Sequence, residues 1–107
     1  MYFPRIIYAI YPFDENGHVA GVYVGSTKNV EKRIKIHERT KSTNKREDPQ
    51  FILHSLMRKN GFSYQILDTI YEYGERHLEY DWMDFFEKQS SLKVFNLAKD
   101  CHSPDYR

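Results

Sequence analysis

Residues 22–37 read VYVGSTKNVEKRIKIH, a strand pattern that passes directly into a helix pattern. Valine and tyrosine favour strands, and Asn29 is a good N-cap for the helix that follows. The helix stripe that should face the core carries Arg33 and His37 among its apolar residues. A buried arginine is costly without an anion nearby, so this stripe is a candidate anion-binding site. An ion pair of Arg33 with a carboxylate, with His37 as a satisfied helix-end residue, is the plainer alternative.

A second strand pattern precedes the first one. Residues 5–12 are rich in Ile and Tyr and predict a strand, and residues 19–25 predict its return strand. The intervening DENG at 14–17 ends in Asn-Gly, a strong hairpin signal. In such a hairpin Tyr8 and Tyr23 lie on neighbouring strands, although tyrosine is a common strand residue in any protein.

The rest of the chain predicts two further helices and a third strand. The first helix should cover about residues 30–40, and the second should begin at Asp48-Pro49 and stop near Asn60-Gly61. A strand at 62–70 and a helix at about 75–89 follow, and residues 94–97 form a short extended piece. The side chains expected to face inward from the second helix are Ile52, Leu53, Leu56 and Met57. Those expected on one face of the strand are Phe62, Tyr64, Ile66 and Ile70. The expected packing face of the last helix is Leu78, Trp82, Phe85 and Phe86, bordered by Glu79.

This order predicts an α+β fold, with a small three-stranded, mainly antiparallel sheet flanked by three helices. The 107 residues suit one domain. We place that domain at residues 1–99 and a C-terminal tail at 100–107.

Composition narrows the function classes. The net charge is only +1, but residues 28–46 hold eight basic against two acidic side chains, which favours a polyanionic partner. A solvated helix and charged loop would be the plainer reading. Cys101 is the sole cysteine, so an internal disulfide is excluded. No run approaches the ~18 apolar residues of a membrane span. We therefore expect an intracellular, cytoplasmic protein with no membrane partner.

Hydrolysis of a phosphodiester requires three functions: activation of water, stabilisation of charge on the phosphate, and stabilisation of the leaving oxygen. Arg33 suits the second, because its guanidinium can bond two phosphate oxygens. Glu79 could bind a hard cation or pair with Arg33, and Asn96 could bond a phosphate or cap a turn. A metal site made of His77, Glu79 and Asp81 is disfavoured, because alternate positions on a helix do not share a face.

Taken together, these residues resemble the GIY-YIG endonuclease superfamily, in its phage and intron-type branch. The resemblance spans about residues 6–97. It is carried by Ile7-Tyr8, by the block from Tyr23 to His37, by residues 48–62, by Glu79 and by Phe95-Asn96-Leu97. Two features depart from the family: Ile6 replaces a glycine, and the hairpin loop is longer than in many members.

The resemblance implies a DNA endonuclease of a phage or mobile element that uses one divalent ion, Mg²⁺ or Mn²⁺. It implies that Tyr8 activates water, Tyr23 orients water or phosphate, and Arg33 stabilises the phosphorane. His37 would assist proton transfer or hold a phosphate, Glu79 would bind the metal, and Asn96 would support the site. The candidate DNA contacts are Ser26, Lys28, Lys32, Lys41, Lys45 and Arg46.

The sequence leaves alternatives open for the activity of the chain and for the source of any DNA sequence preference. The chain could be a catalytically inactive nucleic-acid-binding module of the same fold. Any sequence preference would have to come from loops 13–19 and 40–48, from oligomerisation, or from an additional recognition module or partner protein. The oligomeric state is not predicted.

Overall fold

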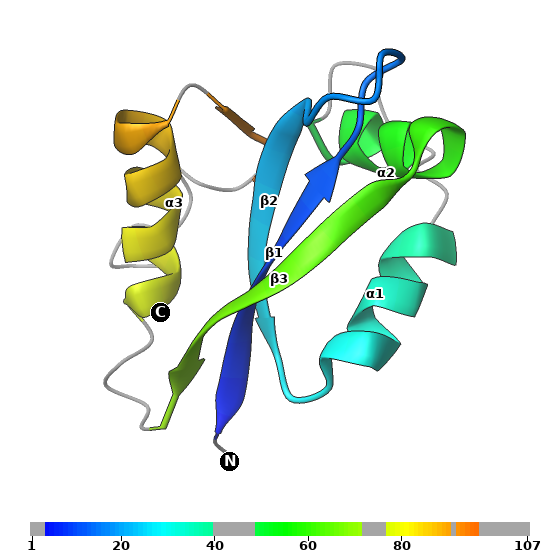
Figure 1. The fold of residues 1–107 in the computed structure, drawn as a ribbon. Helices are drawn as coiled ribbons and strands as arrows, with labels where there is room; N and C mark the ends of the chain where they lie inside the picture. Colours follow the sequence, from blue (N-terminus) through cyan, green and yellow to red (C-terminus); the bar gives the residue numbers. More distant parts are fainter. Residues whose placement is uncertain (1–3, 40–48, 72–76, 91, 97–107) are drawn as a thin grey trace.

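The computed structural model describes residues 4–39, 49–71, 77–90 and 92–96. Figure 1 shows a small sheet with helices packed on both of its faces. The elements in chain order are β1 (Arg5–Pro12), β2 (Gly21–Thr27), α1 (Val30–Arg39), α2 (Pro49–Asn60), β3 (Phe62–Ile70), α3 (Leu78–Gln89) and β4 (Lys93–Val94). The α+β class and the three helices are therefore confirmed. No helix within the described ranges is long and apolar enough to cross a membrane.

The predicted hairpin between β1 and β2 is present, with Tyr8 opposite Gly25 in an antiparallel register. Asp14 closes its loop, because one carboxylate oxygen accepts hydrogen bonds from the backbone N–H groups of Asn16 and His18. Gly17 adopts a φ of 83°, which a residue with a side chain rarely does. The return strand is displaced two residues along the chain from its predicted range of 19–25.

The described residues form a sheet of four strands rather than the predicted three, in the order β3-β1-β2-β4. The fourth strand, β4, runs parallel to β2 and pairs with Gly21 and Val22, which makes the sheet mixed. A strand of two residues has too few positions to show alternation, so only its pairing reveals it. Gly21 permits this pairing, since a Cβ atom there would overlap the Phe95 ring.

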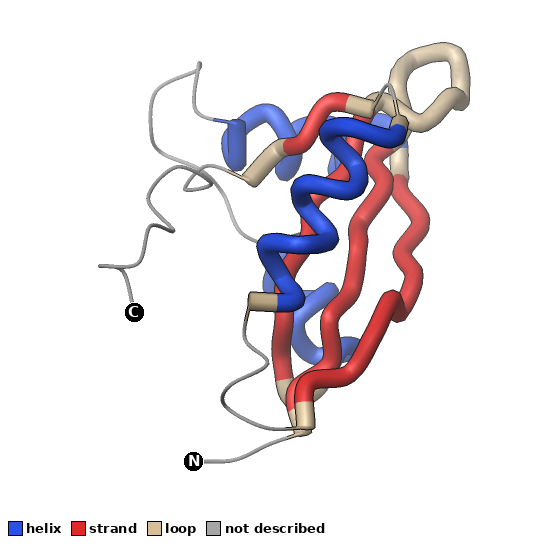
Figure 2. The backbone as a smooth tube through the Cα atoms, turned by 90° about the vertical axis from the view of Figure 1, so that its left-hand side faces the viewer, coloured by secondary structure: helices blue, strands red, loops and turns tan. Residues whose placement is uncertain are grey.

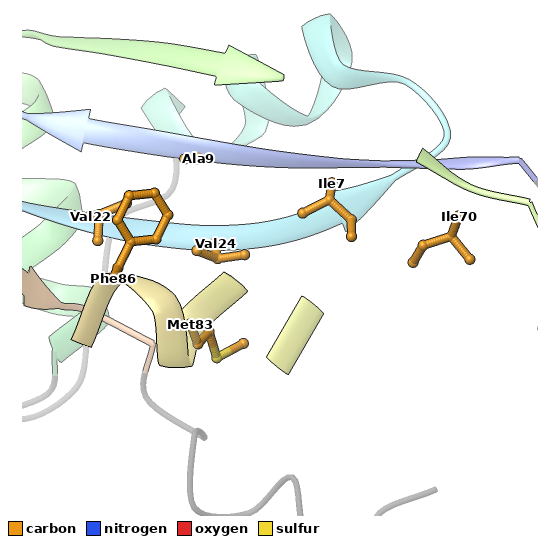
Figure 3. Close-up of a cluster of buried hydrophobic side chains, with 7 residues drawn as sticks. All are labelled: Ile7, Ala9, Val22, Val24, Ile70, Met83 and Phe86. Atoms are coloured by element: carbon orange, nitrogen blue, oxygen red, sulfur yellow. The ribbon is translucent and has the colours of Figure 1, made fainter. Parts of the chain in front are cut away.

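The helices divide between the two faces of the sheet, with α3 on one and α1 and α2 on the other (Figures 1 and 2). Successive residues of β1 alternate between the faces, so Ile7 and Ala9 face α3 while Tyr8 and Ile10 face α1 and α2. Figure 3 shows the cluster under α3, which comprises Ile7, Ala9, Val22, Val24, Ile70, Met83 and Phe86. The cluster under α1 and α2 comprises Tyr8, Ile10, Val30, Ile34, Leu53, Met57 and Phe95.

Two expected packing faces need correction. In β3, Ile70 joins the cluster under α3 while Phe62 packs on the other side, so they do not share a face. The cause is a shift in register beside Ile7 and Tyr8 of β1, which inserts one residue and reverses the alternation. In α3, Met83 lies at the buried centre and Phe85 is 48% exposed. The helix is therefore rotated relative to the predicted stripe.

The predicted boundaries of α1 and α2 agree with the structure where it describes them, and α3 ends at Gln89 as predicted but begins at Leu78, after its N-cap His77. Asn29 caps α1, because its side-chain oxygen accepts the Lys32 N–H at 3.0 Å. Gly61 ends α2 with a φ of 88° and donates its N–H to the Met57 carbonyl. The proposed N-cap Asp48, the basic loop at 40–48, the first residues of the last predicted helix and the tail at 100–107 lie outside the described residues.

Candidate active site

The centre of the site is a hydrogen bond between Tyr8 of β1 and His37 of α1. The Tyr8 hydroxyl lies 3.0 Å from His37 Nε2, and the two side chains are 1% and 4% exposed. The fold makes this contact, because Tyr8 points to the α1 face and His37 lies on the inward stripe of α1. The predicted convergence of this phenol and this imidazole is therefore present.

Tyr23 completes an aromatic cluster around His37. Its ring centroid lies 5.0 Å from that of His37 and 6.4 Å from that of Tyr8. The contact with His37 is edge-to-face, a favourable arrangement for aromatic rings. Both predicted tyrosines thus lie beside the predicted histidine.

Gly25 makes room for the Tyr8 side chain. A Cβ atom at position 25 would lie 2.5 Å from the Tyr8 hydroxyl oxygen and 2.7 Å from Cζ. Real Cβ atoms do not approach other atoms so closely, so any side chain would push the phenol away. The glycine of the Tyr-Val-Gly triplet is therefore required by close approach, at a φ that other residues can adopt.

Arg33 lies one turn before His37 on α1 and interacts with both phenols. Its guanidinium is placed to donate hydrogen bonds to Tyr8 and to Tyr23. Burial acts to lower the pKa of Arg33, but these bonds and the charge of the phenolates raise it overall. Among the described residues Arg33 interacts with two phenols rather than with a carboxylate, so the alternative of an Arg33–carboxylate ion pair is not what this part of the structure shows.

Burial raises the pKa of both tyrosines above their ordinary value. For Tyr8, burial is the largest cause and the nearby Tyr23 adds to it, while the hydrogen bond from Arg33 opposes both. For Tyr23, burial again dominates and Arg33 again opposes it. Both phenols are therefore protonated at neutral pH, and Tyr8 can act as a base only if its own proton leaves at the same time.

His37 is held neutral. Its burial, and then the positive charge of Arg33 and the neighbouring His54, lower its pKa from 6.5 to about 4. A neutral imidazole has one ring nitrogen that accepts and one that donates. His37 can therefore accept a hydrogen bond from the Tyr8 hydroxyl at neutral pH.

This low pKa predicts a dependence of stability on pH. The unfolded chain binds a proton at His37 below about pH 6.5, whereas the folded protein does so only below about pH 4. The contribution of His37 to the free energy of unfolding is therefore fully present above about pH 6.5, and it is lost as the pH falls from about 6.5 to about 4. Between about pH 7.5 and about pH 5, His37 should account for a loss of about 2 kcal/mol in the free energy of unfolding.

Urea unfolding at the two pH values, on the wild type and on a His37→Gln protein, measures this contribution. The variant should lose about 2 kcal/mol less than the wild type over the same change. Equal losses in the two proteins would show that His37 titrates at its ordinary pKa in the folded state.

Glu79 approaches this cluster from the other face of the sheet. It is the second residue of α3, and its carboxylate accepts a hydrogen bond from the Ser26 hydroxyl at 3.1 Å. Its negative charge contributes to the raised pKa values of Tyr8 and Tyr23, although less than burial does. The carboxylate of α3 is therefore near enough to both phenols to influence their pKa values.

Asn96 follows β4 and bonds to the backbone of β2 rather than to a side chain of the site. Its side-chain oxygen accepts the Val24 N–H at 3.0 Å, and its side-chain N–H₂ group donates to the Val24 carbonyl at 2.7 Å. The amide thus extends the β2–β4 ladder by one position. These two bonds hold this part of β2 in place, and they use only one of the two N–H groups of the amide.

His54 of α2 is a member of this cluster that the sequence did not indicate. Its Nε2 lies 3.1 Å from His37 Nδ1, and its side chain is 4% exposed. It lies beside Leu53 on the inward side of α2. The available signal was the same as for His37, a polar residue on an apolar helix stripe.

The structure describes three of the six residues that were predicted to contact DNA. Lys28 and Lys32 are exposed around the N-terminus of α1, where a polyanion could reach them. Ser26 is partly buried, and its hydroxyl donates a hydrogen bond to the Glu79 carboxylate. Lys41, Lys45 and Arg46 lie outside the described residues.

The donor set indicates which metal ions the site could hold. No group of three or more His, Cys, Asp or Glu side chains within the described ranges could hold a metal ion. Zinc needs three or four such protein ligands and does not fit. Mg²⁺ is commonly bound by one or two carboxylates together with water and substrate phosphates. The single carboxylate of Glu79 fits that pattern.

Comparison with protein families agrees with this geometry. Residues 5–93 match the family model of the GIY-YIG catalytic domain. The chain belongs to the GIY-YIG family. Domains of this family are typically nucleases that act on DNA and use a divalent metal ion. Neither the curated proteins nor the solved structures contain a significant match to the chain.

Proposed function

We propose that this GIY-YIG domain is a metal-dependent DNA endonuclease that hydrolyses phosphodiester bonds. The observation that carries the proposal is the 3.0 Å contact between the Tyr8 hydroxyl and a neutral His37, next to the guanidinium of Arg33. This arrangement supplies a base for water beside a cation for phosphate.

Tyr8 is the proposed base. Its raised pKa favours the protonated phenol, so the proton of the attacking water moves to the Tyr8 oxygen as the phenol proton moves to His37 Nε2. His37 becomes positively charged in this step, and the negative charge that develops on the phosphorane lies close by. The contact is within the range in which proton transfer occurs directly.

Arg33 and Tyr23 are proposed to hold the phosphate. The guanidinium is only partly buried, so one side of it can bond to phosphate oxygens while the other contacts the phenols. Such a charge-assisted contact stabilises the extra negative charge of the transition state. Tyr23 lies against both His37 and Arg33 and would orient the phosphate or the attacking water.

Glu79 is the proposed metal ligand, held by the hydrogen bond from Ser26. A Mg²⁺ or Mn²⁺ ion bound there would neutralise charge on the phosphate and stabilise the leaving oxygen. Asn96 supports the site indirectly through its two bonds to Val24. The exposed lysines near the start of α1 would contact the DNA backbone, which predicts weak and salt-sensitive binding.

Incubation of the purified protein with supercoiled plasmid tests the proposal. Nicked or linear DNA should accumulate with Mg²⁺, and EDTA should stop its formation. A Tyr8→Phe protein purified in the same way controls for contaminating nucleases. The alternative, an inactive module, predicts a shift of the plasmid in a binding assay at low salt with no cleavage under any divalent ion.

A further inference from the structure

We propose that His54 is a positioning residue of this site, which holds His37 in the tautomer whose Nε2 can accept the Tyr8 proton. The effect on rate rests on the nuclease function proposed above. The tautomer of His37 does not depend on that function, and it can be measured without any cleavage assay.

The geometry is a continuous chain of three buried side chains from three elements. Tyr8 of β1 lies 3.0 Å from His37 Nε2, and His37 Nδ1 lies 3.1 Å from Nε2 of His54 on α2. The three side chains are at most 4% exposed, so bulk water does not compete for these bonds. The His37 and His54 ring centroids are 5.3 Å apart.

The direction of the hydrogen bonds follows from Arg33. A guanidinium can only donate, and Arg33 lies near enough to Tyr8 to act on its pKa, so the phenolic oxygen is placed to face Arg33 as an acceptor. The phenolic hydrogen then needs an acceptor of its own, and His37 Nε2 lies at the right distance. In this arrangement neutral His37 carries its single hydrogen on Nδ1 and donates it to His54 Nε2, which requires His54 to carry its own hydrogen on Nδ1.

This tautomer is the less common one, because a free imidazole side chain prefers the hydrogen on Nε2. The hydrogen bond made by one ring nitrogen decides which nitrogen carries the hydrogen. The groups that face His37 are Tyr8 from β1, Tyr23 from β2, Arg33 on its own helix and His54 from α2. The Nδ1 contact in this set is with His54, so His54 selects the tautomer.

Loss of this acceptor would block the base. His37 would return to the Nε2–H form, and both His37 and Arg33 would then donate to the Tyr8 oxygen. The phenolic hydrogen would have no acceptor, so Tyr8 could not take a proton from water. With His54 in place, the Tyr8 O–H bond breaks, a His37 Nε2–H bond forms, and the water proton replaces the one that the phenol lost. The water oxygen then bonds to phosphorus and the leaving oxygen departs with the electrons of the broken P–O bond, to be protonated by solvent.

Two substitutions at this position separate the roles of hydrogen bonding and charge. His54→Gln keeps an acceptor, the amide oxygen, but cannot bind a proton at neutral pH. His54→Leu keeps a similar volume and removes the acceptor. Lys59→Ala, an exposed position on the same helix, is the matched control.

The ¹⁵N chemical shifts of the histidine ring nitrogens report the tautomer directly. In the wild type and in His54→Gln, His37 should show a hydrogen on Nδ1. In His54→Leu it should show the hydrogen on Nε2. A wild-type His37 with its hydrogen on Nε2 would overturn the inference whether or not the protein cuts DNA, and so would an unchanged tautomer in a folded His54→Leu protein.

The rate of a single round of cleavage gives the second readout. His54→Gln should stay within about threefold of the wild type, and His54→Leu should be about 10- to 100-fold slower, the range for residues that orient a functional histidine. A His54→Gln protein as slow as His54→Leu would overturn a positioning role and require His54 to carry charge. A wild type that does not cut DNA would refute the proposed function, while the ring-nitrogen shifts would still decide the role of His54.

Discussion

A Tyr8→Phe protein is expected to cleave DNA at least about a thousandfold more slowly than the wild type, with its stability largely retained. The substitution removes one oxygen atom, and with it the group that would take the proton from water. General-base catalysis contributes about 10²- to 10⁴-fold, and the hydroxyl also holds His37 and Arg33 in place. The phenylalanine ring fits the same buried position under α1 and α2.

The measurement is the single-turnover cleavage rate at saturating Mg²⁺. Tyr11→Phe is a matched control on the same strand, because its hydroxyl bonds to the exposed Gln65 on the other side of β1 from His37. The control should cut at nearly the wild-type rate. A Tyr8→Phe rate within about tenfold of the wild type would remove Tyr8 from the role of base and would favour His37 itself, which needs no phenol to accept a proton.

The second large effect is expected from Glu79→Gln. Glutamine retains the oxygen that accepts the Ser26 hydroxyl, so the side chain should keep its position while it loses its negative charge. A neutral amide is a poor ligand for Mg²⁺, whose preferred ligands are carboxylate, phosphate and water oxygens. We expect the cleavage rate at a fixed low Mg²⁺ concentration to fall by about 10²- to 10³-fold, with partial recovery as the concentration of Mg²⁺ rises.

Titration of the cleavage rate with Mg²⁺ measures this effect. Asp81→Asn removes an exposed carboxylate from the first turn of the same helix and serves as the control for net charge. Its titration curve should overlie that of the wild type. The metal assignment fails if Glu79→Gln reaches half of its maximal rate at the same Mg²⁺ concentration as the wild type.

Local patterns identified most of the elements, because their signals lie within a few residues of one another. Asn29 and Gly61 were recognised as helix ends, and the structure shows the hydrogen bonds that they make there. The hairpin followed from Asn-Gly in the same way. The alternation of side chains in β3 predicted the wrong face for Ile70, because the register shift that reverses the alternation depends on the pairing of β3 with β1.

The site was accessible to sequence reasoning for a similar reason. Arg33 and His37 are polar residues on a helix stripe that would be apolar if it only packed in a hydrophobic core, and this conflict indicated a functional site. Asn96 gave a weaker signal, because an asparagine near a strand can equally well bind a ligand or form hydrogen bonds with a neighbouring backbone. Its two bonds to Val24 are a property of the β2–β4 pairing, which joins residues 72 positions apart.

The sequence by itself determined the α+β class, the hairpin with its two tyrosines and the inward-facing arginine and histidine of α1, because local propensity and periodicity encode them. Only the tertiary structure decided that Glu79 of α3 contacts Ser26 of β2, that Asn96 joins a fourth strand, and that His54 of α2 contacts His37. Those contacts join segments far apart in the chain, and they depend on strand register and helix rotation. The packing of the whole domain sets both.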